Sequence, residues 1–228
     1  MFSLVWILIR FKLTFVLVST VDRRAKRKLL LRQKILDAAC TILLADGFAG
    51  LTMRRVAAAI DYAPATIYLH FQSREQIAQE LCFAGLDRLY QRLVAVTAKD
   101  PADRLAGYAR AYLTYAQEDP ETYRLIFMAE AQLTKAVFTQ SAASVSGEAS
   151  LALIANAFAE LSTPMKDRSL KATESAELLW AALHGLASLR LACSQALTLD
   201  EFRGAQVLVS AILENATVGR KIRSFRRK

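Results

Sequence analysis

Arginine, hydroxyl and imidazole side chains are concentrated in one short stretch of the chain, residues 52–74. Arg54, Arg55, Thr66, Tyr68 and His70 fall within it, at positions that the apolar pattern leaves facing outward. Guanidinium and hydroxyl groups near helix starts bind phosphate oxygens and so fix the register of a protein on a duplex. These residue types predict the binding of a nucleic acid, without any covalent step.

The residues that catalysis or metal binding would need are scarce. Neither of the two histidines, His70 and His184, has an acid, cysteine or serine partner at a fixed spacing. The sequence contains no phosphate-binding loop and no dinucleotide fingerprint. The three cysteines form no Cys-x-x-Cys pair, which predicts reduced thiols and no zinc site (Cys40, Cys82 and Cys193). We therefore expect a cytoplasmic protein that is not an enzyme and holds no cofactor or metal.

The net charge of +9 is unevenly distributed along the chain. Residues 1–80 contain twelve Lys and Arg against six Asp and Glu, and residues 217–228 contain six against none. Residues 81–216 contain twelve against fifteen. Basic ends on a mildly acidic body suit phosphate binding through those ends. A solubilising bias of charge is the alternative that composition leaves open.

Met1–Thr20 is an apolar extension whose status the sequence leaves open. Arg10 and Lys12 lie in its middle, and each central Arg or Lys costs about 2.5–3.5 kcal/mol on insertion scales, which disfavours a membrane-spanning helix. A secretory signal carries its charges before the apolar stretch, whereas here they interrupt it. We favour a working protein that starts near Val21, with membrane attachment as the alternative.

Helical periodicity places the candidate contacts on two short helices. The sequence predicts a helix over Leu29–Ala45 that ends at Asp46-Gly47, and a second over Thr52–Ile60 with Thr52 as its N-cap. A tight turn at 61–63 leads to a third helix over Pro64–Phe71, because proline suits a first helical position. Two short helices joined by such a turn can place the second one in the major groove.

The rest of the chain is also predicted to be helical, since Gly and Pro are few and Ala and Leu recur. Ser73 and Gln76 form a capping-box pattern that opens a helix through about Val96. Further helices are predicted over 101–117, 121–129, 150–161, 171–195 and 199–216, while residues 131–147 stay ambiguous. The predicted fold class is all-α, with an N-terminal three-helix helix-turn-helix domain and a C-terminal helical domain.

The segment LTMRRVAAAIDYAPATIYLHFQSREQI, residues 51–77, resembles the DNA-binding signature of the TetR family of transcriptional regulators. The preceding segment LRQKILDAACTILLADGF, residues 31–48, is similar to the first helix of that family. The resemblance covers residues 29–82, and its most specific part is the Tyr-x-His-Phe run at 68–71 followed by Ser-Arg-Glu. It implies phosphate contacts from three residues, namely Thr52, Tyr68 and Arg74. It implies base or groove contacts from the start of the recognition helix, namely Pro64, Ala65 and Thr66.

Some positions in this segment depart from the family pattern or have two explanations. The resemblance places His70 close to the DNA backbone, with packing and capping as an equal alternative. Asp61 replaces the usual turn glycine, and we expect the turn to survive because Asp tolerates a left-handed conformation. Arg74 stands where Lys is commoner and keeps the charge. Leu69 occupies an often polar position, where it contacts a thymine methyl or lies on the surface.

Two segments of the C-terminal half resemble one subgroup of the family's regulatory domains. They are DPETYRLIF, residues 119–127, and LWAALHGL, residues 179–186, which is similar to the Trp-x(3)-His-Gly signature of the WHG-type C-terminal domain. Trp180 and His184 lie four residues apart and face the same way on one helix. Either they form a core pair, with the histidine bonded to backbone, or they line an effector pocket. The aromatic residues that could complete such a pocket are Tyr112, Tyr123 and Phe127.

The last two predicted helices carry apolar faces that are wider than one chain needs, which favours a dimer. Gly185 costs about 1 kcal/mol against Ala within a helix, which suggests a close helix approach there. Two heads one helical turn apart would read a palindrome. The resemblance thus implies a homodimeric repressor that binds double-stranded DNA and is released from it by a small apolar effector. A DNA-binding adaptor that recruits a protein partner is the alternative.

The predicted division of the chain follows from these segments. Residues 1–20 form the apolar extension and 21–85 the helix-turn-helix domain. Residues 86–216 form the regulatory and dimerisation domain, and 217–228 a basic tail.

Overall fold

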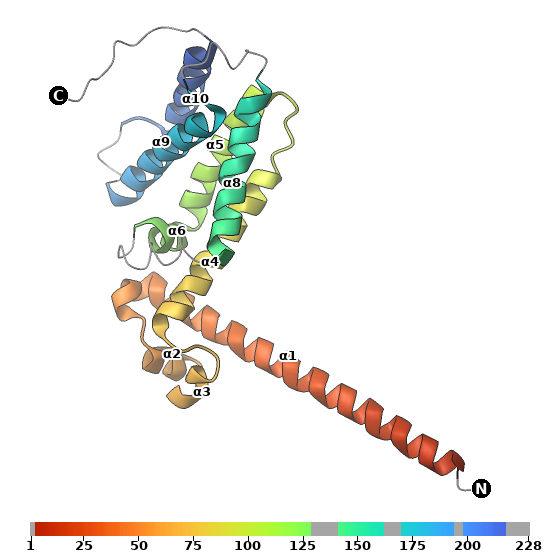
Figure 1. Ribbon diagram of the computed structural model, residues 1–228. Helices are drawn as coiled ribbons and strands as arrows, with labels where there is room; N and C mark the ends of the chain where they lie inside the picture. Colours follow the sequence, from red (N-terminus) through yellow and green to blue (C-terminus); the bar gives the residue numbers. More distant parts are fainter. Residues whose placement is uncertain (1–2, 129–140, 162–169, 194–197, 218–228) are drawn as a thin grey trace, which may run out of the picture. The chain divides into compact units, whose positions relative to one another are not determined.

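The computed structural model describes residues 3–128, 141–161, 170–193 and 198–217, with side chains for 23–128, 145–161, 170–193 and 198–214. Every regular element in these ranges is an α-helix (Figure 1), which confirms the predicted all-α class. Contacts divide the chain into two units, and the division falls between Ala78 and Gln79. The predicted division after residue 85 lies later in the same helix and stays a prediction.

The first unit contains the three N-terminal helices and the start of the fourth. They are α1 (Ser3–Gly50), α2 (Met53–Ala59), α3 (Pro64–Tyr68) and α4 (Arg74–Val94). α2 packs against both α1 and α3. The core of this unit consists of apolar side chains that are fully buried, among them Ile35, Ala39, Leu51, Val56, Ile67 and Phe71.

The first and third helices differ in length from the prediction. α1 runs from Ser3 to Gly50 instead of Leu29–Ala45. Directly before Leu29, residues 23–28 are Arg, Lys and Ala, which favour a helix even where no apolar face marks it. Gly47, with φ 65° and ψ −171°, is not helical and separates two helical segments within these bounds, so the first segment ends at Asp46-Gly47 as predicted. α3 ends at Tyr68 instead of Phe71, because the next two residues close tighter turns, with the amide of His70 bonded to the carbonyl of Ile67.

The second unit is built around one central helix. α5 (Pro101–Glu118) contacts α6 (Pro120–Phe127), α8 (Ser141–Glu160), α9 (Ala172–Ala192) and α10 (Glu201–Thr217). Asp100 caps α5, since its carboxylate accepts the amides of Ala102 and Asp103 at 2.9 and 3.1 Å. α8 begins at Ser141, earlier than the predicted Ser150. Of the ambiguous segment 131–147, residues 131–140 lie outside the described residues.

Buried aromatic and aliphatic side chains form the core of the second unit, including Leu105, Tyr112, Tyr123, Phe158, Leu179 and Leu183. Ion pairs and hydrogen bonds join the helices around it. Arg104 on α5 pairs with Glu160 on α8, and Arg124 on α6 donates to the carbonyl of Leu191 on α9 at 2.9 Å. None of the helices in the described ranges has the length and hydropathy that a bilayer crossing needs.

Candidate functional site

The helix-turn-helix segment begins at Thr52, which caps α2. Its hydroxyl oxygen accepts the amide hydrogen of Arg55 at 3.2 Å, so the hydroxyl proton remains for another acceptor. Met53, Val56 and Ala57 point into the core. Arg54 is exposed, and no described side chain pairs with its guanidinium. This end of α2 therefore presents a hydroxyl and a cation to solvent, as the sequence predicted.

The turn between α2 and α3 is closed by backbone bonds. Asp61 has a φ of 58°, and the amide of Tyr62 donates to the carbonyl of Ala57 at 3.0 Å. Asp therefore adopts the left-handed conformation expected of it where the family usually has glycine. Pro64 is the first residue of α3, where its missing N–H costs nothing.

α3 is held to the unit by one buried side chain. Ile67 is fully buried, while Pro64 and Ala65 are exposed. Tyr68 is 55% exposed and Leu69 77%. Thr66 is half-buried. A short helix that is buried on one side and exposed on the other can enter a DNA groove while its buried contacts stay intact.

Arg32 and Lys28 on α1 lie beside the end of α3. The Arg32 guanidinium donates to the carbonyl of His70 at 2.8 Å and lies 4.2 Å from the ring centroid of Phe71. Burial, and then the positive charges of Lys28 and Arg32, lower the pKa of His70. His70 is therefore neutral near pH 7, where it can donate or accept a hydrogen bond but adds no charge.

Two of the predicted phosphate-binding arginines are bound within the chain. Arg55 forms an ion pair with Asp46 and donates to the carbonyl of Gly50 at 3.1 Å. Arg74 donates to Glu75 at 2.9 Å and to the carbonyl of Leu51 at 3.4 Å, with its guanidinium 4.6 Å from the ring centroid of Phe48. Both side chains brace the first unit, and each keeps further N–H donors for a ligand.

The predicted effector residues form a connected group in the second unit. The hydroxyls of Tyr112 and Tyr123 lie 3.2 Å apart, and the Tyr123 hydroxyl lies 2.6 Å from Nδ1 of His184. Burial raises the pKa of Tyr123 to about 12 and that of Tyr112 well above its ordinary value, and it lowers the pKa of His184. All three groups are neutral at physiological pH. His184 is thus bonded to a tyrosine, which sequence reasoning did not foresee.

A cavity of about 300 Å³ lies beside this group; among the described residues it is shallow and open to the surface, and its lining is mostly apolar. Its lining consists of Phe127, Leu151, Glu177, Trp180, Ala181 and His184. Phe127, Trp180 and His184 were predicted for the pocket, and the structure brings them to one cavity. Tyr112 and Tyr123 contact these residues from the core instead: the ring centroids of Tyr112 and Trp180 are 6.5 Å apart. Leu151 on α8 was missed, because nothing local in the sequence marks α8 as a neighbour of Trp180. Glu177 was also missed, although it precedes Trp180 by three residues on α9, a spacing that places both on one face of the helix.

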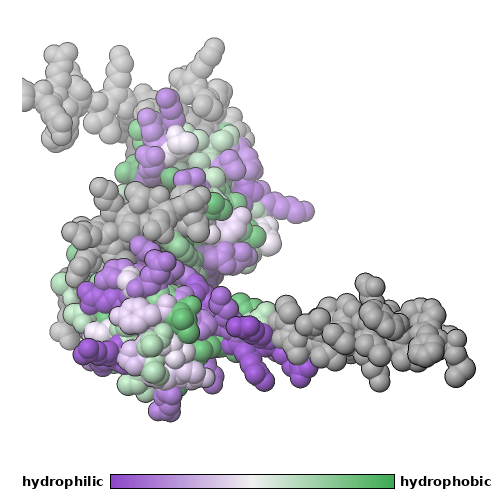
Figure 2. Space-filling view, turned by 60° about the horizontal axis from the view of Figure 1, so that its bottom comes forward, coloured by the Kyte–Doolittle hydropathy of each residue, from purple (hydrophilic) through white to green (hydrophobic). Residues whose placement is uncertain are grey.

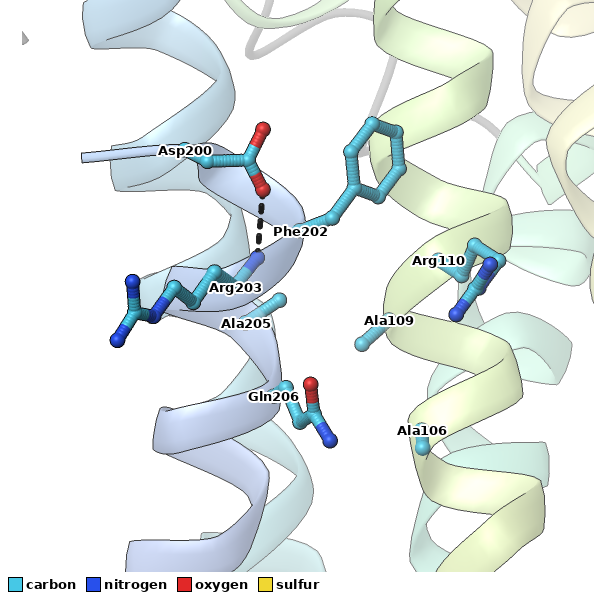
Figure 3. A pocket seen from close by; sticks show the side chains of 8 residues that line it. All are labelled: Ala106, Ala109, Arg110, Asp200, Phe202, Arg203, Ala205 and Gln206. Carbon is cyan, nitrogen blue, oxygen red and sulfur yellow. Dashed lines mark hydrogen bonds between the residues drawn. The ribbon is translucent and has the colours of Figure 1, made fainter. Parts of the chain in front are cut away.

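A second cavity, of about 320 Å³, lies between α5 and α10 (Figure 3). Small side chains, Ala106, Ala109 and Ala205, leave the space open. The Asp200 carboxylate accepts the amide of Arg203 at 2.8 Å, and the Arg203 side chain extends away from α5 (Figure 3). None of the predicted site residues lines this cavity.

Two family models match the sequence. Residues 35–81 match the one described as bacterial regulatory proteins, tetR family. Residues 105–212 match the one described as a tetracyclin repressor-like C-terminal domain. The chain belongs to the TetR family. These matches cover the helix-turn-helix of the first unit and most of the second, so the resemblance noted in residues 29–82 is confirmed.

A curated relative of the chain is YobS of Bacillus subtilis (strain 168), described as an uncharacterized HTH-type transcriptional regulator. It is 27% identical over 95 residues, which are 41% of this chain and 50% of YobS. The chain thus matches YobS over about half of the length of that relative.

Solved structures show the same fold at low sequence identity. The regulatory protein SCO4313 superposes with a TM-score of 0.68 at 22% identity, over 83% of this chain and 98% of that one. The fatty acid degradation regulator FadR of Bacillus halodurans gives 0.63 at 15% identity, over 80% and 94%. PfmR, a TetR family regulator of Thermus thermophilus, gives 0.54 at 17%, over 79% and 97%. Identities this low establish the fold alone.

Proposed function

We propose that this TetR family member is a sequence-specific DNA-binding repressor that acts as a homodimer and leaves a palindromic operator when a small effector binds. The observation that carries the proposal is the exposed outer surface of α3. Only Ile67 anchors that helix, while Pro64, Ala65, Tyr68 and Leu69 are open to solvent. The helix is therefore available to a major groove without rearrangement.

The residues around α3 divide into base contacts and phosphate contacts. Pro64, Ala65 and Thr66 lie at the start of α3 and would face the base edges. Phosphate contacts would come from the Tyr68 hydroxyl, from the Thr52 hydroxyl, whose proton is not used by the α2 cap, and from the Arg54 guanidinium. Arg55 and Arg74 would contact phosphates through the N–H donors that are not used in their hydrogen bonds within the chain. His70, neutral and beside Arg32, would add at most one hydrogen bond.

The exposed face of α9 supports the homodimer. Leu178 and Leu189 are 47% and 51% exposed, and Gly185 lies between them at helical spacing. A Cβ built at Gly185 would meet no described atom within 4 Å. The close approach suggested by this glycine therefore does not occur within the described chain, and a second copy would supply it. Leu179, by contrast, is fully buried in the core of its own chain and belongs to no interface.

The cavity beside Trp180 supports a small effector in preference to the protein-recruiting alternative. Its size lies at the lower end of small-molecule sites. An apolar lining favours an apolar ligand, and the ring of His184 offers it one hydrogen bond. The carboxylate of Glu177 at the same cavity disfavours an anion. A ligand can shift the dimer away from its DNA-binding conformation only by its difference in affinity for the two states.

Selection of bound fragments from random duplexes tests the DNA-binding half of the proposal. We expect recovery of an inverted repeat, and we expect Thr66→Ala with Tyr68→Phe to weaken its binding at least tenfold, because a hydrogen bond to a charged group contributes about 1.5–3 kcal/mol. Thr173→Ala with Tyr90→Phe, outside the first unit, is the matched control. If the first pair binds the selected duplex as tightly as the control, α3 is not the reading helix.

A compound screen against that operator complex tests the effector half. An effector should release the wild-type protein from the duplex, and Trp180→Ala should reduce this response without changing DNA affinity in the absence of the compound. A compound that releases both proteins equally would place the effector site elsewhere.

A further inference from the structure

The part of α1 that precedes the helix-turn-helix is a run of cations without an acid. Between Asp22 and Asp37 the sequence has seven basic residues, which are Arg23, Arg24, Lys26, Arg27, Lys28, Arg32 and Lys34. All of them except the half-buried Arg32 are exposed. Figure 2 shows the hydrophilic surface of this stretch beside the segment drawn in grey. Sequence reasoning counted these charges but assigned them no site.

Three of these cations form one stripe that leads to the recognition helix. Arg24, Lys28 and Arg32 are spaced four residues apart, so they lie on the same face of α1. Arg32 bonds the carbonyl of His70 directly, and the charge of Lys28 acts on the His70 ring. The stripe therefore begins at the end of α3 and continues along α1. The span from Arg32 to Arg24 is about 12 Å at 1.5 Å per residue.

We propose that Arg24 and Lys28 form an accessory phosphate-binding stripe on α1, which extends the duplex-binding surface beyond the helix-turn-helix. Arg32 anchors the stripe to α3. The inference rests on the proposed DNA-binding function, because α3 has to be seated in a groove for α1 to lie beside the strands.

Charge and geometry both favour a duplex as the partner of this stripe. A polyanion offers regularly spaced charges to a row of cations, and no carboxylate between residues 23 and 36 competes for them. Both side chains lie on a continuous helix, so their spacing is fixed before binding. Because both are exposed, their binding to phosphate would release counterions while burying little other surface. An anionic membrane surface has similar charge, so the experiment must distinguish binding to a membrane from binding to a duplex.

The experiment measures the salt dependence of duplex binding by Arg24→Gln with Lys28→Gln. Lys26→Gln with Lys34→Gln removes the same charge from other faces of α1 and is the matched control. Each phosphate contact contributes about 0.9 to the slope of log K against log salt. We expect the stripe variant to lower that slope by about 1.8 for each protomer, and the control to change it by much less. At 0.15 M salt the loss is about fivefold in affinity for each contact, if the contribution vanishes near 1 M.

Two kinds of duplex separate this inference from the proposed function. On an operator duplex with long flanks, the stripe variant should bind more weakly than wild type. On the same operator trimmed to its inverted repeat, the two proteins should bind alike. A mixed-sequence duplex gives the salt slope even if selection recovers no operator, so failure of sequence-specific recognition does not prevent the measurement.

Equal salt slopes for wild type and the stripe variant on every duplex would overturn the inference. Equal losses in the stripe variant and the control would also overturn it, because the effect would then belong to net charge. Binding to phosphatidylserine vesicles is measured in parallel. If the stripe variant loses vesicle binding and keeps the duplex slope, the stripe binds membrane and the inference is wrong.

Discussion

Two glycines in the middle of helices of the second unit should respond in opposite ways to the same substitution. A Cβ at Gly85 on α4 would lie 2.8 Å from Cδ1 of Ile126 and 3.0 Å from the hydroxyl of Tyr115, and closer still to Cγ2 of Thr122. All three neighbours are buried, so they have little room to move. A Cβ at Gly185 on α9 would meet nothing within 4 Å among the described residues.

The magnitudes follow from two opposing effects. Gly→Ala within a helix gains about 1 kcal/mol from propensity at either site. Overpacking costs about 1–3 kcal/mol and applies only at Gly85, where carbon atoms below van der Waals distance have to separate. We therefore expect Gly85→Ala to lower the free energy of unfolding by up to about 2 kcal/mol. We expect Gly185→Ala to raise it by about 1 kcal/mol in the isolated protomer.

Urea unfolding followed by far-ultraviolet circular dichroism measures both variants. Each is compared with wild type at several protein concentrations, because a second copy at the α9 face would also meet the new methyl group of Gly185→Ala. In that case its gain should shrink or reverse as the dimer forms. A Gly85→Ala protein more stable than wild type by the full propensity gain of about 1 kcal/mol would refute the described packing of α4 against Thr122 and Ile126.

Three further predictions concern groups whose partners the structure defines. Glu201→Gln should lower the free energy of unfolding at neutral pH by about 1–3 kcal/mol, because Glu201 is buried and accepts from Arg190 and Gln117. Burial alone would raise the pKa of Glu201, but its backbone bond and these two partners outweigh burial and lower it; urea midpoints should therefore fall on acidification below about pH 4.5 more in wild type than in the variant. His184→Gln should reduce the loss of thermal stability between about pH 7.5 and pH 5.5, because the lowered pKa of His184 makes wild-type stability fall as the unfolded chain protonates near pH 6.5. An equal pH dependence in both proteins would contradict this assignment. Thr52→Ala should cost about 0.5–2 kcal/mol of unfolding free energy through loss of the α2 cap, and Thr52→Ser, which keeps the hydroxyl, should cost much less.

Local signals in the sequence predicted the caps and the turn of the helix-turn-helix segment well. The hydroxyl of Thr52, the proline at position 64 and the tolerance of Asp61 for positive φ act within a few residues of chain. Helix bounds were predicted less well where apolar periodicity was the only guide, as in α1. That helix continues through residues 23–28, where Arg, Lys and Ala have high helix propensity but form no apolar face.

Contacts between residues far apart in the sequence were not predictable from spacing. The ion pair of Arg55 with Asp46 and the bond from Tyr123 to His184 depend on how helices pack. The sequence identified Arg55 as an outward cation but did not reveal that a carboxylate already holds it. It also grouped His184 with Tyr123 as pocket residues. In the structure His184 lines the cavity, whereas Tyr123 lies behind it in the core.

The arginine at position 74 links the beginnings of two helices. Its planar guanidinium lies over Phe48 and holds the carbonyl of Leu51, the residue just before the Thr52 cap, while its own backbone opens α4. Lysine would keep the charge but could neither stack flat on the ring nor offer a forked set of donors. A phosphate that draws on Arg74 would therefore also pull on the peptide that leads into α2. The starts of α2 and α4 are in this way mechanically coupled through a single side chain.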